Sequence, residues 1–98
     1  MTHLTVVATL KAKPGCEDKF FAMLQDLIAP TRAEPGCINY DLHRSDEEPG
    51  TFLFHETWGS RPLWEAHMQS PHLVAFGKSS GALMESWTLF VGQRLGQD

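Results

Sequence analysis

The sequence predicts an α+β fold in which helices cover one face of a four-stranded antiparallel sheet. Four segments alternate apolar and polar residues with the period of a strand, and two regions between them carry apolar residues at helical spacing. Their order along the chain is β-α-β-β-α-β, and a connection of hairpin length joins the two central strands. This order is typical of the ferredoxin-like sandwich. The 98 residues are enough for one such domain, residues 1–98, with a single core of modest size.

The chain begins with a predicted strand over residues 4–11, in which apolar side chains alternate between the two faces. Lys13-Pro14-Gly15 ends this strand. From residue 17 to about residue 33 the apolar period becomes helical. Pro30 lies late in this helix, so we expect a kink or an early end there. The predicted apolar stripe of the helix consists of Phe20, Leu24, Leu27 and Ile28.

Two further strands are predicted in the middle of the chain. Glu34-Pro35-Gly36 is a strong stop signal for the helix, and a strand follows at residues 37–44. The polar residues 45–50 then lead to a third strand at residues 51–58. Because side chains alternate along a strand, Glu56 points to the same face as three aromatic residues. Those three residues are Phe52, Phe54 and Trp58.

The last third of the chain carries two helix starts and a final strand. Ser60 is placed to cap a short helix, and Ser70-Pro71 repeats the same signature for a second helix. The second helix has an apolar stripe of Leu73, Phe76 and Leu83 or Met84, and it is weakened by Gly77 and Gly81. A final strand is predicted from the alternation of Trp87, Leu89, Val91 and Leu95 with Thr88, Phe90, Gly92 and Arg94.

The two faces of the predicted sheet differ in polarity. The more apolar face, which we assign to the helices, carries Leu4, Val6, Ile38, Tyr40, Phe52, Phe54, Trp58, Trp87 and Leu89. The opposite face still carries Val7, Leu53 and Phe90 among threonines and histidines. A second subunit covering this open face would explain its apolar content, so we predict a symmetric homodimer formed sheet to sheet. The alternative is a monomer with one half-wetted sheet face.

Composition excludes several classes of partner. The formal net charge is −4 and the pI is about 5.6, so no basic surface is available for nucleic acid. No apolar run approaches the length of a membrane span, and the N-terminus lacks the features of a secretory signal. We therefore expect a cytoplasmic protein that binds neither nucleic acid nor membrane. Cys16 and Cys37 are expected to be reduced structural thiols.

Glu56 and His67 are the strongest candidates for catalysis. A carboxyl group between the sheet and the helices should have a raised pKa, because burial disfavours its charged form. The alternative is that Glu56 only anchors backbone amides or an arginine. His67 lies on an otherwise apolar helical face, and its ordinary pKa suits proton abstraction near neutral pH. A histidine in such a place is also often only a satisfied boundary residue, and its convergence with Glu56 favours the catalytic interpretation.

The remaining candidates would bind a ligand. His72 lies in the first turn of its helix, where exposed amides can hold an anion. Aromatic residues predicted to face the same interior can line an aromatic pocket, and core packing is the alternative interpretation. They are Tyr40, Trp58, Trp64 and Phe76. No metal site is predicted, because His67 and His72 are five residues apart and lack the i, i+4 spacing of a helical metal pair.

Several short motifs follow one another along the chain: Glu34-Pro35-Gly36-Cys37, Tyr40, Glu56-Thr57-Trp58, Glu65-Ala66-His67 and Ser70-Pro71-His72. Together they resemble the motifs of the antibiotic biosynthesis monooxygenase family, small proteins of the dimeric α+β barrel superfamily that include quinol monooxygenases. The resemblance implies a ferredoxin-like subunit, a homodimer and a pocket between helices and sheet. It also implies oxygenation of electron-rich aromatic compounds by O2 without flavin, haem or metal.

That chemistry requires a base, a water-free pocket and a fixed orientation of the substrate. His67 and Glu56 would supply the base, and the aromatic side chains would supply the other two. This aromatic set, which now includes Phe54, is Tyr40, Phe54, Trp58, Trp64 and Phe76. We therefore predict a cofactor-independent monooxygenase that acts on a small aromatic substrate, a quinol or a polycyclic phenol, with O2.

Two other reactions and one non-enzymatic role are the alternatives. Haem-degrading members of the superfamily use a histidine, an asparagine and a tryptophan, where this chain has Gly77, Ala8 and His67, so haem degradation is not expected. A keto–enol isomerase acting on a small phosphorylated metabolite would need a cationic phosphate clamp near His67, for which Arg61, Lys78 and the helix start at His72 are the candidates. The third possibility is a dimer that binds a small ligand without catalysis.

Overall fold

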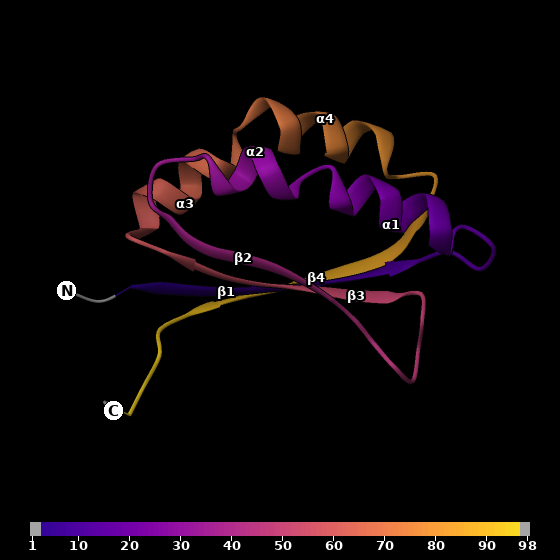
Figure 1. Cartoon of the computed structure of the whole chain (residues 1–98), viewed down its shortest axis with the longest axis horizontal. Helices are drawn as coiled ribbons and strands as arrows, with labels where there is room; N and C mark the ends of the chain where they lie inside the picture. The colour runs from indigo at the N-terminus through magenta and orange to yellow at the C-terminus, as the bar shows by residue number, and fades with distance from the viewer. Residues whose placement is uncertain (1–2, 97–98) are drawn as a thin grey trace.

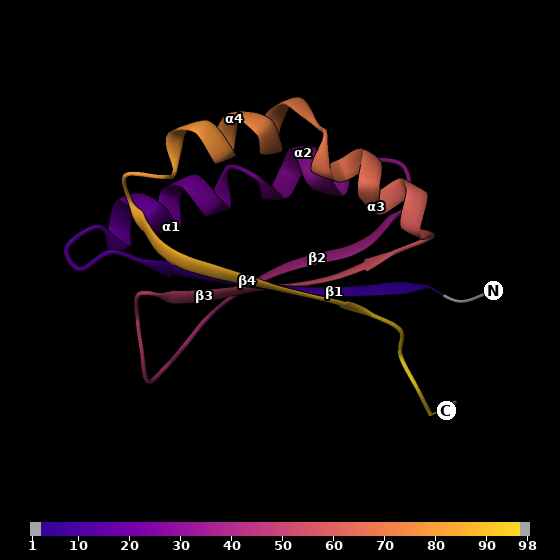
Figure 2. The same ribbon diagram turned by 180° about the vertical axis from the view of Figure 1, so that it is seen from behind.

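The computed structural model describes residues 3–96, and it confirms the predicted arrangement of helices on one antiparallel sheet. All four helices lie on the same side of the sheet, as the two opposite views show (Figures 1 and 2). The strands are β1 (Leu4–Ala12), β2 (Cys37–Arg44), β3 (Thr51–Trp58) and β4 (Met84–Gly92). The helices are α1 (Glu17–Gln25), α2 (Ile28–Arg32), α3 (Arg61–Met68) and α4 (Pro71–Ser79).

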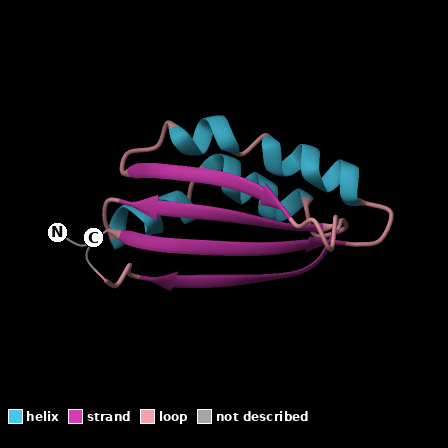
Figure 3. Ribbon diagram, turned by 60° about the horizontal axis from the view of Figure 1, so that its bottom comes forward, coloured by secondary structure: helices cyan, strands magenta, loops and turns pink. Residues whose placement is uncertain are grey.

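The strands lie in the order β2-β3-β1-β4, and every neighbouring pair is antiparallel (Figure 3). This is the strand order of a ferredoxin-like sheet, so the predicted fold class is confirmed. β1 lies inside the sheet between β3 and β4, whereas β2 and β4 form the two edges. No helix within residues 3–96 is long and apolar enough to cross a membrane.

The first helical region is interrupted one turn before Pro30, as its sequence predicts. α1 ends at Gln25 and α2 begins at Ile28. Pro30 has no backbone N–H to donate to the carbonyl of Asp26, so the regular ladder cannot continue through this point. Leu27 N–H instead bonds to Leu24 O, one residue closer, at 3.1 Å. Leu24 and Leu27 are nevertheless both buried, so the apolar stripe continues across the interruption.

The two later helices begin as predicted. Ser60 caps α3 by accepting a hydrogen bond from Leu63 N–H, and Ser70 caps α4 by accepting one from Leu73 N–H. Cys16 and Cys37 are free thiols.

The assignment of Ile38 to the buried face is wrong. The pairing of β2 with β3 is irregular between Cys37 and Asn39, so that Cys37 lies opposite Trp58 and Asn39 opposite Thr57. The extra residue at this irregularity breaks the alternation of faces, and Ile38 is 53% exposed. Cys37 packs against the core in its place.

The final strand also differs from its predicted limits. β4 begins at Met84 and ends at Gly92, so Leu95 lies outside it and is 87% exposed. Leu83 lies in a turn after α4, not on its apolar stripe. Trp87 pairs with Leu10 and Leu89 with Ala8, which places both on the helix side as predicted. They remain exposed because β4 is an edge strand.

A tight turn brings the segment before β2 against α3. Gly36 has a φ of +84°, a conformation that favours glycine, and its carbonyl accepts a hydrogen bond of 2.8 Å from Gly59 N–H. A Cβ at Gly36 would collide with the Leu63 side chain, lying 2.8 Å from its Cβ. Both the backbone conformation and the close approach therefore require glycine at this position.

The variant Gly36→Ala should lower the free energy of unfolding by about 2–4 kcal/mol, because left-handed backbone strain and overpacking both contribute. Gly15→Ala is a matched control, since Gly15 has the same φ of +84° but a Cβ there would meet nothing within 4 Å. It should cost only about 1–2 kcal/mol. Urea denaturation of both variants measures the difference. Equal costs would show that the approach of Leu63 does not constrain Gly36.

Candidate functional site

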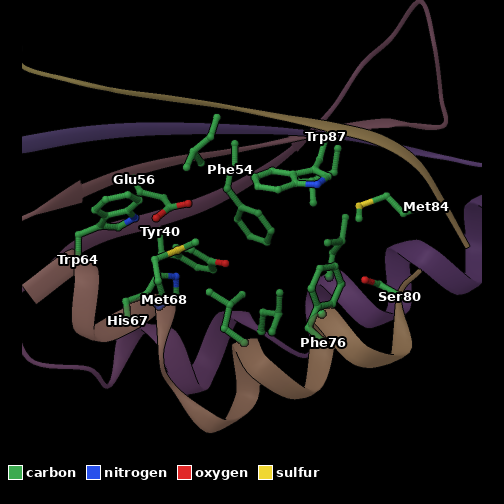
Figure 4. Close-up of a pocket in the computed structure, with 17 residues that line it drawn as sticks. Tyr40, Phe54, Glu56, Trp64, His67, Met68, Phe76, Ser80, Met84 and Trp87 are labelled. Atoms are coloured by element: carbon green, nitrogen blue, oxygen red, sulfur yellow. The ribbon is translucent and has the colours of Figure 1, made fainter. Parts of the chain in front are cut away.

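A pocket of about 390 Å³ lies between the helices and the sheet (Figure 4). Its wall is mostly apolar and comes from all four strands and from helices α1, α3 and α4. Figure 4 shows Glu56, Tyr40 and His67 at one end of it and Ser80, Met84 and Phe76 at the other. The apolar wall residues are chiefly Leu10, Leu24, Phe54, Trp64, Met68, Leu73, Phe76, Trp87 and Leu89. This is the place in which the sequence predicts a ligand pocket.

Six of the eight predicted site residues line this pocket. They are Glu56, His67, Tyr40, Phe54, Trp64 and Phe76. Trp58 does not reach it, because its side chain is fully buried behind the wall, where its ring stacks on the His67 ring with centroids 4.7 Å apart. His72 does not line the pocket either, and its side chain contacts Glu34. Trp58 and His72, both predicted to bind the substrate, are therefore not among the residues that line the pocket.

Glu56 is held on β3 with its carboxyl group almost completely out of water. It is 3% exposed, and its Oε1 accepts a hydrogen bond of 2.9 Å from Trp58 Nε1–H. Its Oε2 has no hydrogen-bond partner among residues 3–96. Burial raises the pKa of Glu56 to about 7, the Trp58 bond opposes that rise and the negative charge of Glu34 adds to it. Near neutral pH this carboxyl group can therefore both give and take a proton.

His67 is buried on α3, in the position predicted from its helical face. It is 2% exposed, and its Nδ1 lies 2.7 Å from Glu34 Oε2. Burial lowers the pKa of His67, and the adjacent Glu34 carboxylate opposes this effect. Because Nδ1 is engaged by Glu34, Nε2 is the ring nitrogen left to act on a molecule in the pocket.

Tyr40 completes the polar end of the pocket. It lies directly opposite Glu56 on the neighbouring strand β2, and its ring meets the edge of the His67 ring at 5.7 Å between centroids. Burial raises the pKa of the Tyr40 hydroxyl, and the charge of Glu56 adds to this effect. The hydroxyl therefore stays protonated and can donate a hydrogen bond to an anionic oxygen.

Glu34 is the residue that sequence reasoning missed. It follows α2, and its Oε2 lies 2.7 Å from His67 Nδ1 and 2.8 Å from His72 Nε2. Glu34-Pro35-Gly36 predicted only the end of a helix, and no spacing rule connects positions 33 and 38 residues apart. The Glu34-Pro35-Gly36-Cys37 motif of the family resemblance was the one signal that this residue matters.

The Glu34, His67 and His72 side chains also form the kind of group that can hold a metal ion, which the i, i+4 criterion overlooked. Their three ligand atoms lie within 4.8 Å of one another. Two of the three separations, 2.7 and 2.8 Å, are hydrogen-bond lengths. Two ligands of a tetrahedral zinc ion would stand about 3.3 Å apart, given metal–ligand bonds of about 2.0–2.1 Å. As it stands, the cluster has the geometry of a hydrogen-bonded network.

No lysine or arginine lines the pocket within residues 3–96. Arg61, a candidate phosphate clamp, pairs with Glu65 at 3.5 Å on the surface of α3 and lies over the Trp64 ring. Lys78, the second candidate, is exposed on α4, and His72 at the start of α4, the third, does not line the pocket. Ala8 and Gly77 do lie on the wall, and neither has a side chain that could bind a haem iron.

Comparison with known proteins agrees with the motifs. The sequence model of the family described as antibiotic biosynthesis monooxygenase matches residues 3–79. The Synechocystis protein sll1783 is 36% identical over 81 residues, which cover 83% of this chain and 55% of that protein. The present chain therefore spans little more than half the length of this relative. The Mycobacterium tuberculosis protein named "Putative monooxygenase Rv0793" is 33% identical over 81 residues, covering 83% of this chain and 79% of that protein.

Solved structures share the whole fold. The structure of PA3566 from Pseudomonas aeruginosa superposes with a TM-score of 0.94 at 33% identity, covering 98% of this chain and 97% of that chain. The structure of Rv0793 superposes with a TM-score of 0.90 at 30% identity, covering 98% of both chains.

The raised pKa of Glu56 makes stability depend on pH. A carboxyl group whose pKa is 4.5 in the unfolded chain and about 7 in the fold binds its proton more tightly when folded. Its contribution is therefore most favourable below pH 4.5, and the free energy of unfolding falls by roughly 3 kcal/mol as pH rises past 7. Glu56→Gln should remove this dependence. Between pH 4.5 and 8.5 the free energy of unfolding of the variant should therefore rise by that amount relative to the wild type.

Urea denaturation at a series of pH values measures this gain, with Glu47→Gln in the exposed connection before β3 as the control. A difference between wild type and Glu56→Gln that stays constant with pH would show that Glu56 titrates at its ordinary value.

Proposed function

The chain belongs to the antibiotic biosynthesis monooxygenase family, and from this premise we propose that it is a cofactor-independent monooxygenase that oxidises a quinol or a polycyclic phenol with O2. The observation that carries the proposal is the apolar pocket with a free imidazole nitrogen and a carboxyl group of pKa about 7 at the same end. Such a pocket has the three properties that the reaction needs: a base, a low dielectric and walls that fix an aromatic ring.

The size of the pocket favours more than one ring. A dry cavity of about 150 Å³ is known to take a benzene molecule, and this pocket measures about 390 Å³. Its volume therefore suits two or three fused rings, or one ring with a substantial substituent. Phe54, Trp64 and Phe76 offer aromatic faces to such a substrate.

The first step of the proposed reaction is removal of the phenolic proton by His67 Nε2. In the apolar pocket the resulting phenolate is poorly solvated and electron-rich, and the protonated hydroxyl of Tyr40, which lines the pocket, can donate a hydrogen bond to its oxygen. The phenolate then passes one electron to O2, which gives a phenoxyl radical and superoxide. The walls hold this pair together until it recombines by forming a carbon–oxygen bond at a ring carbon.

The proton transfers of the later steps can be assigned to His67 and Glu56. His67 returns its proton to the terminal oxygen of the new peroxide. Glu56 as carboxylate removes the proton from the ring carbon, the oxygen–oxygen bond breaks, and the hydroxide that leaves becomes water by taking up that proton. One oxygen atom of O2 thus enters the product as a quinone carbonyl and the other leaves as water, so no external reductant is required.

The wall composition favours oxygenation over the isomerase alternative. A phosphorylated metabolite carries about two negative charges, and burying them without a cation is costly. The pocket residues include no lysine or arginine within the described part of the chain, and both candidate cations lie on the outer surface. An uncharged aromatic substrate meets no such cost.

Replacing the proposed base should remove activity. We expect His67→Ala to lower kcat with naphthohydroquinone-type substrates by a factor of about 10² or more, the usual contribution of a positioned base. His3→Gln, an exposed histidine outside the pocket, should leave kcat unchanged. Oxygen uptake measures the rate, and ¹⁸O2 labelling should place one labelled atom in the quinone product. Wild-type turnover in His67→Ala would contradict the proposed role of this residue.

The same experiment separates the other functions. An isomerase would exchange substrate protons without consuming O2, and a binding protein would do neither. Wild-type rates in the presence of EDTA, with no flavin or haem absorbance in the purified protein, are expected of a cofactor-independent enzyme.

We also propose that the chain acts as a homodimer through the face of the sheet that lacks helices. On this face Phe90 is 58% exposed, and it lies opposite the half-buried Val7 of β1. Leu53 of β3 adds a further apolar side chain on the same side of the sheet. A second copy of the same surface would remove these apolar side chains from water in a symmetric contact.

Phe90→Lys should therefore convert the dimer to a monomer, because two lysines would face each other or an apolar partner across the interface. Leu95→Lys is the matched control, since Leu95 is more exposed, at 87%, but lies beyond the end of β4. Light scattering after size exclusion should show at least a tenfold weaker dimer for Phe90→Lys and no change for Leu95→Lys. A wild-type monomer would contradict the proposed assembly.

A further inference from the structure

We propose that Glu34 and His72 are a pair of positioning residues that fixes the tautomer of His67 and sets the pH range over which His67 can accept a proton. The inference deepens the proposed function, since it rests on His67 as the base. It concerns two side chains that do not line the pocket, and it can be measured on the protein without any substrate.

The three side chains come from separate parts of the chain and meet at one oxygen atom. Glu34 lies in the connection between α2 and β2, His67 on α3, and His72 in the first turn of α4. Glu34 Oε2 lies 2.7 Å from His67 Nδ1 and 2.8 Å from His72 Nε2. The exposed fraction of the side chain increases along this row, from 2% for His67 to 15% for Glu34 and 22% for His72. The row thus runs from the pocket wall toward solvent.

The short contact with Glu34 decides which nitrogen of His67 carries the hydrogen. An ionised carboxylate only accepts hydrogen bonds, so His67 Nδ1 must be the protonated nitrogen of the neutral ring. The lone pair is then on Nε2, the nitrogen left for the substrate. Without Glu34 the ring could adopt the opposite tautomer, in which Nε2 carries a hydrogen and cannot act as a base.

Glu34 also compensates for the burial of His67. A cationic imidazole with 2% exposure is poorly solvated, and burial alone lowers its pKa. The carboxylate beside Nδ1 stabilises the cation that forms when Nε2 takes a proton. This is the role of the carboxylate in a nucleophile–histidine–acid triad, here with a substrate hydroxyl in place of the nucleophile.

His72 acts in the opposite direction through the same oxygen. Its Nε2 donates to Glu34 Oε2, and Ser70 Oγ lies 3.3 Å from the same nitrogen. When His72 is protonated, its positive charge disfavours a second cation at His67. His67 therefore keeps a free Nε2 to lower pH than it would beside Glu34 alone.

The other titratable groups near His67 do not produce the same effect. Tyr40 on β2 meets the His67 ring edge-on and stays neutral, because burial raises its pKa. Glu56 on β3 lines the same pocket and titrates near pH 7, but it makes no hydrogen bond with His67. An effect of Glu56 would also persist in variants of Glu34 and His72, so it can be separated from theirs.

The test is ¹⁵N NMR of the His67 ring in the wild type, Glu34→Gln and His72→Gln, without substrate. We expect the wild type to show Nδ1 protonated and Nε2 unprotonated. The pKa of His67 should fall in Glu34→Gln, which loses the carboxylate charge, and rise in His72→Gln, which keeps a donor but loses the positive charge. Glu65→Gln on the exposed surface of α3 and His3→Gln should cause no shift.

Kinetics supplies a second readout. Glu34→Gln should lower kcat by about 10–100-fold with little change in KM, the size of loss seen when the carboxylate that orients a metal-bound histidine is removed. Glu34→Asp should restore part of the rate, because it keeps the carboxylate. If Glu34→Gln does not fold, Glu34→Asp is the variant whose kinetics are measured. In His72→Gln the acid limb of kcat/KM should move to higher pH.

Shifts in the same direction for both variants, no shift, or a wild-type ring protonated on Nε2 would each overturn the proposal. So would micromolar binding of Zn²⁺ that Glu34→Gln and His72→Gln both abolish, because the three side chains would then be a metal site. The expected NMR shifts in a protein that consumes no O2 would leave the positioning pair intact and reject the proposed function instead.

Discussion

The burial of two ionisable side chains in one apolar pocket is the constraint on which this structure depends. Glu56 and His67 are 3% and 2% exposed, and each has lost most of its contact with water. Neither side chain offsets the free-energy cost of burying the other, since no hydrogen bond joins them. Trp58 bonds to Glu56 and Glu34 bonds to His67, and the Trp58 ring stacks on the imidazole. Glu56 and His67 at the polar end of the pocket are therefore held in place by residues that do not line it. The polar atoms of Glu56 and His67 that these contacts do not use can bind a ligand.

Local periodicity was sufficient to predict most of the fold and half of this arrangement. The alternation of β3 places Glu56 with the aromatic side chains, and the cap at Ser60 with the helical period places His67 on the inner face of α3. Both inferences depend on neighbours within a few residues. Glu34 could not be found in this way, because its partners are 33 and 38 residues distant and meet it only in the folded chain. The burial of Ile38 was predicted wrongly for a different reason. One inserted residue in β2 turns its side chain to the other face of the sheet, and the hydrophobic pattern carries no signal of that insertion.

The sheet separates the two roles proposed for the chain. Successive residues of β1 point to opposite faces, so Val6 and Ala8 belong to the core and pocket while Val7 lies on the face without helices. A partner on that face would not occupy the pocket, yet it would hold the strand from which the pocket floor is built. The apolar wall of the pocket reaches the edge of the sheet at Trp87 and Leu89, because β4 is an edge strand.

The two ends of the pocket have different relations to the family. The match to the family model ends at residue 79, and the residues of the polar end, Tyr40, Glu56 and His67, lie inside it, as does Glu34 behind the wall. At the opposite end Phe76 lies inside the match, whereas Ser80 and Met84 lie beyond it. Ser80 Oγ is buried without a hydrogen-bond partner among residues 3–96, and an unpaired buried hydroxyl is costly unless something satisfies it. On the proposed function, the residues of the reacting end therefore all come from the part of the chain that the family model matches.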